Sequence, residues 1–428
     1  MSSNLPPSAF LRGFFMLNQT KQTEIGFKEL GISADILNVI KTLKLETPTP
    51  IQIKSIPVAL TGQDLVGVAQ TGTGKTFAFG IPMIERLMLS RGRGLVLLPT
   101  RELAMQVEEN LRQLGAKLGL RTAALIGGQA IGVQAQSLRR NPHILVATPG
   151  RLIDHLQRGW VKLDDIKILV LDEADRMFDM GFAPQIEEII KWIPMARQTL
   201  LFCATMPRAI LKLASAHMTM PIYIEVAPPG TTVEYVDQEV YVMRKEDKRG
   251  QLEKILHEYQ GSVLIFTRTK HGAKNLARNL EQSGHQVAEI HSNLSFNQRC
   301  EAMAGFKSRK YRILIATDIA ARGIDVSDIE LVVNYDLPDD SEDYVHRIGR
   351  TARAGKIGKA ISFALPTQGT DVRSIERLIN KKLTLKKFAE LEQANTRPYV
   401  RRYGRTMSFG RSVAPRSRPG GFGRRRGR

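Results

Sequence analysis

The amino-acid sequence predicts an α/β protein with two tandem domains, each built on a mostly parallel sheet flanked by helices. Short runs of Val, Ile and Leu alternate with amphipathic stretches from residue 23 to residue 390. Several runs are apolar at nearly every position, which is typical of parallel strands covered on both faces. A segment with two prolines and one glycine, residues 227–235, interrupts this alternation and indicates a linker.

The first domain is expected over residues 23–226. Its helical patterns include Glu102–Leu118 and Gln185–Ile193, which place apolar residues on one face. Strands that alternate with such helices form a parallel sheet, because parallel neighbours need long crossover connections. The expected strands are Leu65–Ala69, Gly94–Leu98, His143–Ala147, Ile166–Leu171 and Gln198–Cys203.

The second domain is expected over residues 236–390, after the linker. Helical patterns at Gly272–Gln282 and Asp371–Leu383 separate its apolar runs. The similarity between the two halves is architectural, since no short-period repeat is visible. The expected strands are Glu239–Val242, Ser262–Phe266, Val287–Ile290, Arg312–Ala316, Leu331–Asn334 and Ala360–Phe363.

The charge of the chain points to a polyanionic partner. Lys and Arg number 62 against 42 Asp and Glu, which gives a formal net charge of +20 over 428 residues. Nucleic acid and an anionic membrane surface are both compatible with this charge. No apolar run reaches the roughly 18 residues of a membrane span. Two cysteines are too few for a disulfide framework or a four-cysteine zinc site, and fit a reducing compartment.

The two ends of the chain differ in composition from its centre. Residues 1–22 are expected to be a flexible extension without a signal peptide, and translation could start at Met1 or Met16. Residues 391–428 are expected to be disordered, because apolar residues are sparse there. From residue 393 onward this tail has eleven Arg but no Lys, Asp or Glu, so +9 remains for the other 392 residues. The Gly-rich tail shows no amphipathic pattern that would favour a membrane.

A glycine-rich segment after the first strand predicts a phosphate-binding loop, or P-loop. Its sequence Ala69-Gln-Thr-Gly-Thr-Gly-Lys-Thr76 lies between a strand and a helical pattern, although the general motif has Gly at position 69. Lys75 is expected to reach the β- and γ-phosphates, and Thr76 to hold Mg²⁺. A simple glycine turn is the alternative. The expected nucleotide-binding residues of this loop are Gln70, Thr71, Gly72, Thr73, Gly74, Lys75 and Thr76.

Acidic residues follow another apolar strand, in the sequence Asp172-Glu-Ala-Asp175. Carboxylates at the carboxyl end of a parallel strand face the crevice where α/β proteins bind ligands. We expect Asp172 to hold Mg²⁺ and Glu173 to act as the general base toward water. A solvated acidic loop is the alternative interpretation.

These motifs and their order resemble the DEAD-box ATP-dependent RNA helicases of the compact bacterial type, from about Phe27 to Leu383. The resemblance implies two tandem RecA-like domains, ATP and Mg²⁺ as cofactors, and RNA as the partner. It implies that Gln52 in Thr49-Pro-Ile-Gln reads adenine and that Phe27 stacks on it. The family usually has Gly and an aromatic residue where Lys44 and Leu45 stand.

The resemblance also implies RNA-backbone contacts in the first domain, in segments where helix capping is the alternative interpretation. A further motif couples hydrolysis to strand separation, and here Cys203 replaces the usual Ser with a weaker hydrogen-bond donor. We expect this change to loosen the coupling. The implied RNA-binding residues are Pro99, Thr100, Arg101, Gly128, Thr148, Pro149, Gly150 and Arg151, and the implied coupling residues are Asp175, Cys203, Thr205 and His346.

In the second domain the resemblance implies RNA contacts from Thr267, Arg268, Arg299 and Thr317, and a ribose contact from Asp325. Phe296 stands where the family has Gln, and Ala352 where it has Gly. In the segment His346–Arg353, we expect Arg350 and Arg353 to reach the γ-phosphate as arginine fingers. The alternative is a surface helix with exposed arginines.

The implied activity is RNA-stimulated ATP hydrolysis that closes two domains on RNA and unwinds short duplexes locally, or remodels RNA–protein complexes. An ATP-gated RNA clamp, a DNA-directed translocase and an assembly scaffold are the alternatives. We expect a cytoplasmic monomer that binds RNA largely independently of sequence, with ribosomal precursors or the RNA-decay machinery as candidate partners.

Overall fold

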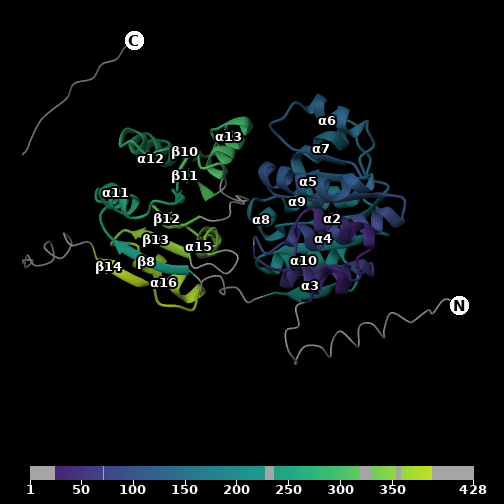
Figure 1. The fold of residues 1–428 in the computed structure, drawn as a ribbon, viewed down its shortest axis with the longest axis horizontal. Helices are drawn as coiled ribbons and strands as arrows, with labels where there is room; N and C mark the ends of the chain where they lie inside the picture. The colour runs from purple at the N-terminus through teal and green to yellow at the C-terminus, as the bar shows by residue number, and fades with distance from the viewer. Residues whose placement is uncertain (1–24, 71, 227–235, 319–328, 353–357, 388–428) are drawn as a thin grey trace, which may run out of the picture. The chain divides into compact units, whose positions relative to one another are not determined.

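The computed structural model describes residues 25–70, 72–226, 236–318, 329–352 and 358–387. The expected extension, linker and tail therefore lie outside the described residues. Figure 1 shows two parallel sheets with helices packed against them. The predicted α/β fold with two tandem RecA-like sheets is confirmed.

The first sheet has seven strands, all parallel to their neighbours. Five of them match the expected apolar runs. Because all the strands are parallel, their carboxyl ends lie at the same edge of the sheet. In spatial order the strands are β3 (Thr122–Leu125), β4 (Ile144–Ala147), β2 (Arg93–Leu97), β5 (Ile166–Leu171), β6 (Gln198–Cys203), β1 (Leu65–Val68) and β7 (Ile222–Glu225).

The helices around this sheet begin where the sequence predicts helix starts. Thr100 precedes α5 and its hydroxyl accepts a hydrogen bond from the Leu103 amide, while Pro50 and Pro149 open α3 and α7. The elements are η2 (Phe27–Leu30), α2 (Ala34–Thr42), α3 (Pro50–Leu60), α4 (Lys75–Leu89), α5 (Arg101–Gly115), η3 (Ala116–Leu118), α6 (Ile131–Leu138), α7 (Pro149–Gln157), α8 (Ala174–Asp179), α9 (Ala183–Lys191) and α10 (Arg208–His217).

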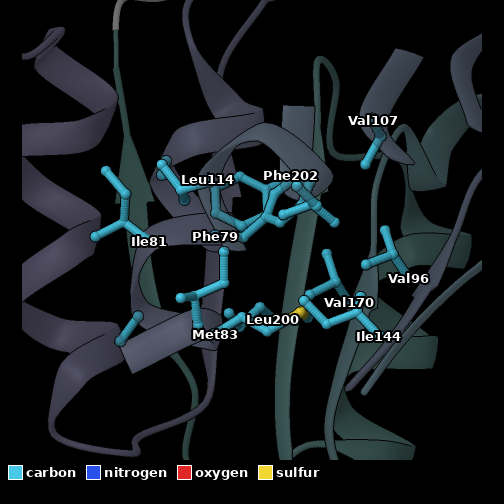
Figure 2. Close-up of a cluster of buried hydrophobic side chains, with 14 of the residues drawn as sticks. Phe79, Ile81, Met83, Val96, Val107, Leu114, Ile144, Val170, Leu200 and Phe202 are labelled. Carbon is cyan, nitrogen blue, oxygen red and sulfur yellow. The ribbon is translucent and has the colours of Figure 1, made fainter. Parts of the chain in front are cut away.

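Apolar side chains from alternate strand positions fill the two faces of the first sheet. Figure 2 shows one of these clusters, in which Phe79 of α4 and Phe202 of β6 approach with ring centroids 5.6 Å apart. The strands β4 and β6 are buried at every position, in agreement with the apolar sequence of β4 and with that of β6 after Gln198 and Thr199. This packing fixes α4, and with it the start of the P-loop helix, against the sheet.

The second sheet repeats the topology of the first. It also has seven parallel strands, and numbered from its own first strand it has the same spatial order, 3-4-2-5-6-1-7. In that order the strands are β10 (Val287–Ile290), β11 (Ile313–Ala316), β9 (Val263–Phe266), β12 (Leu331–Asn334), β13 (Gly358–Ala364), β8 (Val236–Val242) and β14 (Thr384–Lys387).

The helices of this second part are α11 (Lys248–Glu258), α12 (Lys270–Gln282), α13 (Phe296–Lys307), α15 (Ser341–Ile348) and α16 (Gly369–Leu378). The helix expected over residues 371–383 ends earlier because Asn380 adopts the left-handed conformation, with φ of 51°. The Lys381 amide then donates to the Glu376 carbonyl at 3.2 Å, which closes the helix and releases the chain into β14.

No helix in the described ranges is both long and apolar enough to cross a membrane.

Candidate active site

The P-loop joins β1 to α4 as predicted. Gly74 precedes α4 with φ of 91°, and a side chain there would place its Cβ 2.4 Å from the Nε2 atom of Gln52. Both facts restrict this position to glycine. The Thr73 hydroxyl donates to the Gln70 carbonyl at 2.7 Å. Thr71 lies outside the described residues.

Three motifs converge because their strands are neighbours. The P-loop follows β1, the acidic motif follows β5, and Cys203 ends β6, which lies between them. Their carboxyl ends share one edge of the sheet. This is the place where open α/β sheets bind ligands.

A buried ion pair connects the P-loop to the acidic motif. The Lys75 Nζ atom lies 2.9 Å from Oε1 of Glu173, and Arg176 Nε lies 3.2 Å from Oε2. Burial opposes the charge on Lys75, but Glu173, Asp172 and Asp175 outweigh it and raise the pKa of this lysine. Burial likewise opposes the charge on Glu173, but Lys75 and Arg176 hold the pKa of its carboxyl well below its usual range.

The pKa of Asp172 is shifted in the opposite direction to that of Glu173. Burial raises the pKa of Asp172 to about 7, although Lys75 nearby lowers it. The Glu173 amide donates to its Oδ1 atom at 3.0 Å. Glu173 itself adopts φ of 54°, a conformation that is strained for a residue with a side chain and that often occurs at functional sites.

The chemistry around Asp172 fits Mg²⁺. The Asp172 carboxylate and the Thr76 hydroxyl are oxygen donors, which Mg²⁺ prefers. In the described part of the chain, no group of three or more His, Cys, Asp or Glu residues could hold a metal ion. Mg²⁺ typically uses one or two carboxylates together with water and substrate phosphates, so a sparse protein donor set is compatible with it.

Asp175 connects the acidic motif to the end of β6. Its Oδ2 atom accepts hydrogen bonds from the Ala204 amide at 2.9 Å, the Thr205 amide at 2.8 Å and the Thr205 hydroxyl at 3.2 Å. Cys203 is fully buried in an apolar cluster, and burial raises the pKa of its thiol. The contact therefore runs through Thr205 and the Ala204 backbone.

The structure brings Gln52 to the P-loop. Its Oε1 atom accepts from the Thr49 amide at 2.9 Å, and its Nε2 atom donates to the Gly74 carbonyl at 3.0 Å. Phe27 lies in the apolar cluster that also includes Phe79. The adenine contacts of Gln52 and Phe27 stay predictions.

The RNA-binding residues expected in the first domain form a second group. The Arg101 guanidinium lies beside Gly128, whose φ is 81°, and a Cβ atom there would lie 2.3 Å from Arg101 Nη1. Arg151 Nη1 donates to the Gln129 carbonyl at 3.0 Å and to Gln134 Oε1 at 3.3 Å. These contacts place Arg101 and Arg151 around the same loop.

Thr100 and Thr148 differ in how they begin their helices. Thr100 caps α5, with 3.3 Å between its hydroxyl and the Leu103 amide. Thr148 occupies the capping position of α7 without such a hydrogen bond, and Pro149, Gly150 and Arg151 form the first turn. Thr100 is thus a helix cap, whereas Thr148 is not held by this interaction. Pro99 precedes Thr100 at the end of β2.

Two buried polar residues in this group were not predicted. Gln134 and His155 are connected through Gln134 Oε1 and His155 Nε2 at 3.0 Å, and the Gln134 amide also donates to the Ile126 carbonyl at 2.7 Å. They support the loop that Arg151 contacts. One sequence signal was available, because His155 lies four residues after Arg151 on the same helix face.

In the second sheet, Thr267 follows β9 and Thr317 follows β11, which are neighbouring strands. The Thr267 amide donates to the Ala316 carbonyl at 3.0 Å. Arg268 is directed toward Asp339, with 3.3 Å between Nε and Oδ1, and donates to the Leu337 carbonyl at 3.2 Å. Asp325 and Arg353 lie outside the described residues.

The start of α13 contacts the RNA-binding group of the first domain. Arg299 Nη2 lies 2.8 Å from Glu102 Oε1, and Phe296 belongs to an apolar cluster that otherwise consists of first-domain residues. The Phe296 Cβ atom would lie 3.3 Å from a Cβ atom on Gly128. The departure from the family's Gln therefore supplies an apolar contact here.

The helix α15 carries His346, and Arg350 follows two residues after the end of this helix. Between them lies Arg347, which the motifs did not single out. Arg347 is 2% exposed and donates to both carboxylate oxygens of Asp318, at 2.5 and 2.7 Å, and to Asn334 Oδ1 at 3.1 Å. Arg350 Nε donates to the His346 carbonyl at 3.2 Å. The alternative of exposed arginines on a surface helix is wrong for Arg347 and Arg350, because both are buried.

A cavity of about 530 Å³ lies beside these groups. Gln70 of the P-loop, Thr205 after β6, His346 of α15 and Arg350 just after α15 all line it. One predicted nucleotide-binding residue, Gln70, therefore shares this cavity with Arg350 and with the coupling residues Thr205 and His346, whereas Lys75, Asp172 and Glu173 are not among its lining residues.

A P-loop, a carboxylate motif after a neighbouring strand and a second sheet of the same topology define a two-domain nucleotide-hydrolase scaffold. Family models agree with this: residues 49–213 match the DEAD/DEAH box helicase domain, and residues 247–355 match the helicase conserved C-terminal domain. The chain belongs to the DEAD-box family of ATP-dependent RNA helicases.

Its relatives and solved neighbours cover most of its length. The DEAD-box ATP-dependent RNA helicase CshA of Geobacillus kaustophilus is 42% identical over 86% of this chain and 79% of its own. The ATP-dependent rRNA helicase RRP3 of Candida albicans is 42% identical over 83% and 68%. The structure of S. cerevisiae Dbp5 bound to RNA and ADP BeF3 has a TM-score of 0.75 at 30% identity, over 86% of this chain and 97% of that one.

Proposed function

We propose that ATP and RNA together favour a closed arrangement of two RecA-like domains, residues 23–226 and 236–390, joined by the linker 227–235. Hydrolysis then reopens them, which unwinds short RNA duplexes locally and non-processively or remodels RNA–protein complexes. The observation that supports this proposal is a single cavity lined by Gln70, Thr205, His346 and Arg350. Ligands that favour the same closed state must raise each other's affinity.

In this proposal the nucleotide rearranges the Lys75–Glu173 ion pair. Lys75 Nζ contacts Glu173 Oε1 at 2.9 Å. ATP phosphates would attract Lys75, and the Glu173 carboxylate could then orient the attacking water as general base. Arg176, whose Nε atom lies 3.2 Å from Glu173 Oε2, also lowers the pKa of this carboxyl and favours its ionised form.

The remaining nucleotide contacts complete this half of the mechanism. Thr76 and Asp172 would hold Mg²⁺, which when bound neutralises charge on the phosphate oxygens. Gln52 and Phe27 would recognise adenine. Arg350, with Arg353 and Asp325, would supply the contacts from the second domain.

Coupling to RNA is proposed to run through Asp175. Its three hydrogen bonds to Ala204 and Thr205 connect the acidic motif with the end of β6. A change at Glu173 during hydrolysis can therefore reach Thr205 through adjacent residues. His346 of α15 lines the same cavity as Thr205, so a displacement of Thr205 would be transmitted to α15 through His346.

The proposed RNA contacts go to the backbone, because the residues concerned are suited to phosphates and hydroxyls rather than bases. Substrate choice should therefore be largely independent of sequence. The rRNA helicase among the relatives supports ribosomal RNA precursors as candidates, beside the RNA-decay machinery. We further propose a monomer in the cytoplasm.

Two substitutions test the nucleotide mechanism. Lys75→Ala should abolish ATP turnover, because the proposed phosphate contact is lost. Glu173→Gln should retain ATP binding but lose RNA-stimulated hydrolysis by a factor on the order of 10² to 10⁴, the usual contribution of a general base. ATP binding and phosphate release are measured separately for both variants. Normal stimulated turnover in Glu173→Gln would exclude Glu173 as the base.

The same preparations distinguish the alternatives. Displacement of a strand from a short RNA duplex supports unwinding, whereas ATP-dependent retention of RNA without displacement supports the clamp. Stronger stimulation of ATPase by DNA than by RNA would favour the DNA-directed alternative.

A further inference from the structure

An exposed row of cations runs along α12, outside the residues that the family motifs assign. Lys270, Lys274 and Arg278 lie four residues apart on one helix face, and all three are exposed. At 1.5 Å rise per residue, the row extends for about 12 Å. Within the described part of the chain, none of the three forms an ion pair.

The row is not needed for packing. The opposite face of α12 is formed by Ala273, Leu276, Ala277 and Leu280, which are all buried against the sheet. The helix therefore has its apolar contact without the cations. Thr269 caps its start, since its hydroxyl accepts from the Gly272 amide at 3.0 Å.

The cations stand at an unfavourable place in the helix. The amino end of a helix carries partial positive charge, so a lysine in the first turn is repelled by a few tenths of a kcal/mol. The first turn of α12 contains Lys270 and His271 and no acid, so Lys270 does not stabilise the start of this helix.

The position of α12 connects this row with the RNA site. The helix begins three residues after Thr267, at the carboxyl edge of the sheet, and it contacts β10 and β11. Arg268, the neighbouring cation, is already engaged by Asp339 and the Leu337 carbonyl. Lys270 is thus the next cation along the chain, and the first turn of α12 contains no acidic residue.

We propose that Lys270, Lys274 and Arg278 form an additional binding surface for the RNA phosphate backbone, beside the groove formed by the motif residues. This inference rests on the proposed RNA-binding function and extends it. Four-residue spacing separates neighbouring cations by about 6 Å along the helix, so one strand can contact them in succession. The contacts are electrostatic and independent of base sequence.

The test compares two full-length triple variants. Lys270→Gln/Lys274→Gln/Arg278→Gln removes the row, and Arg373→Gln/Arg377→Gln/Lys381→Gln is the matched control. The control cations are also exposed, have the same spacing and lie in the same domain. Arg373 and Arg377 lie in α16 and Lys381 follows this helix, and the chain then enters β14, at the opposite end of the sheet from β10. Both variants change the net charge equally.

RNA affinity is measured with a labelled single-stranded RNA between about 50 and 200 mM salt. Each lost contact to a single strand should reduce the slope of log affinity against log salt by about 0.7, hence by about 2 for the α12 variant. The control should keep the wild-type slope. ATP turnover at saturating RNA should be unchanged in both variants, because neither set contacts the nucleotide site.

Equal slopes in the α12 variant and the wild type, or equal losses in both variants, would overturn the proposal. Absence of RNA binding by the wild type would instead overturn the proposed function. Thermal unfolding provides a second readout: the α12 variant should unfold at the same temperature as the wild type or slightly higher, since unfavourable charge is removed. Should it unfold lower, Lys274→Gln alone should still reduce the slope by about 0.7, and an unchanged slope there would overturn the proposal.

Discussion

Lys44 and Ala352 both adopt a backbone conformation that glycine reaches most easily. Their φ values are 56° in each case. These are two of the positions at which the sequence differs from the Gly of related helicases, so the backbone keeps the conformation although the side chain has changed. At Lys44 the turn ends α2, because the Lys44 amide donates to the Lys41 carbonyl and the Leu45 amide to the Ile40 carbonyl.

Restoring glycine at residue 44 should therefore stabilise the protein. A residue with a side chain in the left-handed region costs about 1–2 kcal/mol, and the greater freedom of glycine in the unfolded chain offsets about half of this. Lys44→Gly should raise the free energy of unfolding by about 0.5–1 kcal/mol. Chemical denaturation measures it. Lys41→Gly, in the last turn of α2, is the control and should lower stability by a similar amount. A decrease in Lys44→Gly would contradict this account.

At the scale of elements, a buried polar network holds α15 on its sheet. The Tyr344 hydroxyl donates to Gln238 Oε1 of β8 at 3.0 Å, and Arg347 contacts Asn334 of β12 and Asp318 after β11. Tyr344 and Arg347 lie three residues apart on the buried face of the helix. His346, on another face of the helix, and Arg350, just after its end, both line the cavity. The network thus sets the rotation of α15.

Removing the Tyr344 hydroxyl should disturb this rotation. Tyr344→Phe removes the hydrogen bond to Gln238 Oε1 and should destabilise the protein by about 0.5–1.5 kcal/mol. We expect the maximal RNA-stimulated ATP turnover to fall several-fold while the KM for ATP changes little, because Arg350 acts mainly on the transition state. Steady-state kinetics and chemical denaturation measure these two effects.

Two further variants separate orientation from stability. Tyr335→Phe is the control in the same domain, since its ring packs 5.8 Å from that of Phe363 and its hydroxyl makes no hydrogen bond among the described residues. Tyr344→Phe/Gln238→Leu replaces both polar partners and should recover stability without recovering turnover. Recovery of both together would show that the hydrogen bond only stabilises the fold.

The strands that could be predicted from the sequence are more deeply buried than the strands that could not. The central strands were predicted because they contain buried apolar runs: β4 is apolar throughout, and β6 is apolar after Gln198 and Thr199. Edge strands lack that signal: β7 exposes three of its four residues, and β14 reads Thr-Leu-Lys-Lys. β14 begins directly after the expected helix over 371–383 and was not assigned, because so short an amphipathic sequence carries no clear strand pattern.

The site shows the same distinction. Lys75 and Glu173 could be predicted because they belong to short motifs at strand ends. Arg347 could not be assigned its buried role, since its partners Asp318 and Asn334 come from other strands and become neighbours only in the fold. Residue spacing within one segment cannot predict an ion pair with a residue from a distant segment.

At the scale of the whole molecule, the direction of β14 determines at which edge of the second sheet Lys387 lies. β14 is parallel to β8, and Lys387 is paired with Val242. Lys387 is therefore at the carboxyl edge of its sheet, the edge at which Thr267 and Thr317 follow their strands. The arginine-rich sequence follows Lys387 in the chain.

This sequence predicts a separable role for the eleven arginines of residues 393–428. Deleting these residues should weaken RNA binding and flatten its salt dependence, because up to eleven phosphate contacts are removed. Turnover at saturating RNA should be nearly unchanged, since a tether raises the local concentration of RNA without altering the catalytic groups.

Two full-length variants distinguish charge from chain length. Replacing the eleven arginines by Ser keeps the length and should reproduce the effect of the deletion, whereas replacing them by Lys keeps the charge and should preserve the salt slope. Weaker binding in the Lys variant at an unchanged slope would indicate arginine stacking on bases in addition. RNA affinity over a salt series and ATP turnover at saturating RNA measure these outcomes. A large loss of maximal turnover on deletion would show that the tail takes part in catalysis, because a tether acts on RNA affinity alone.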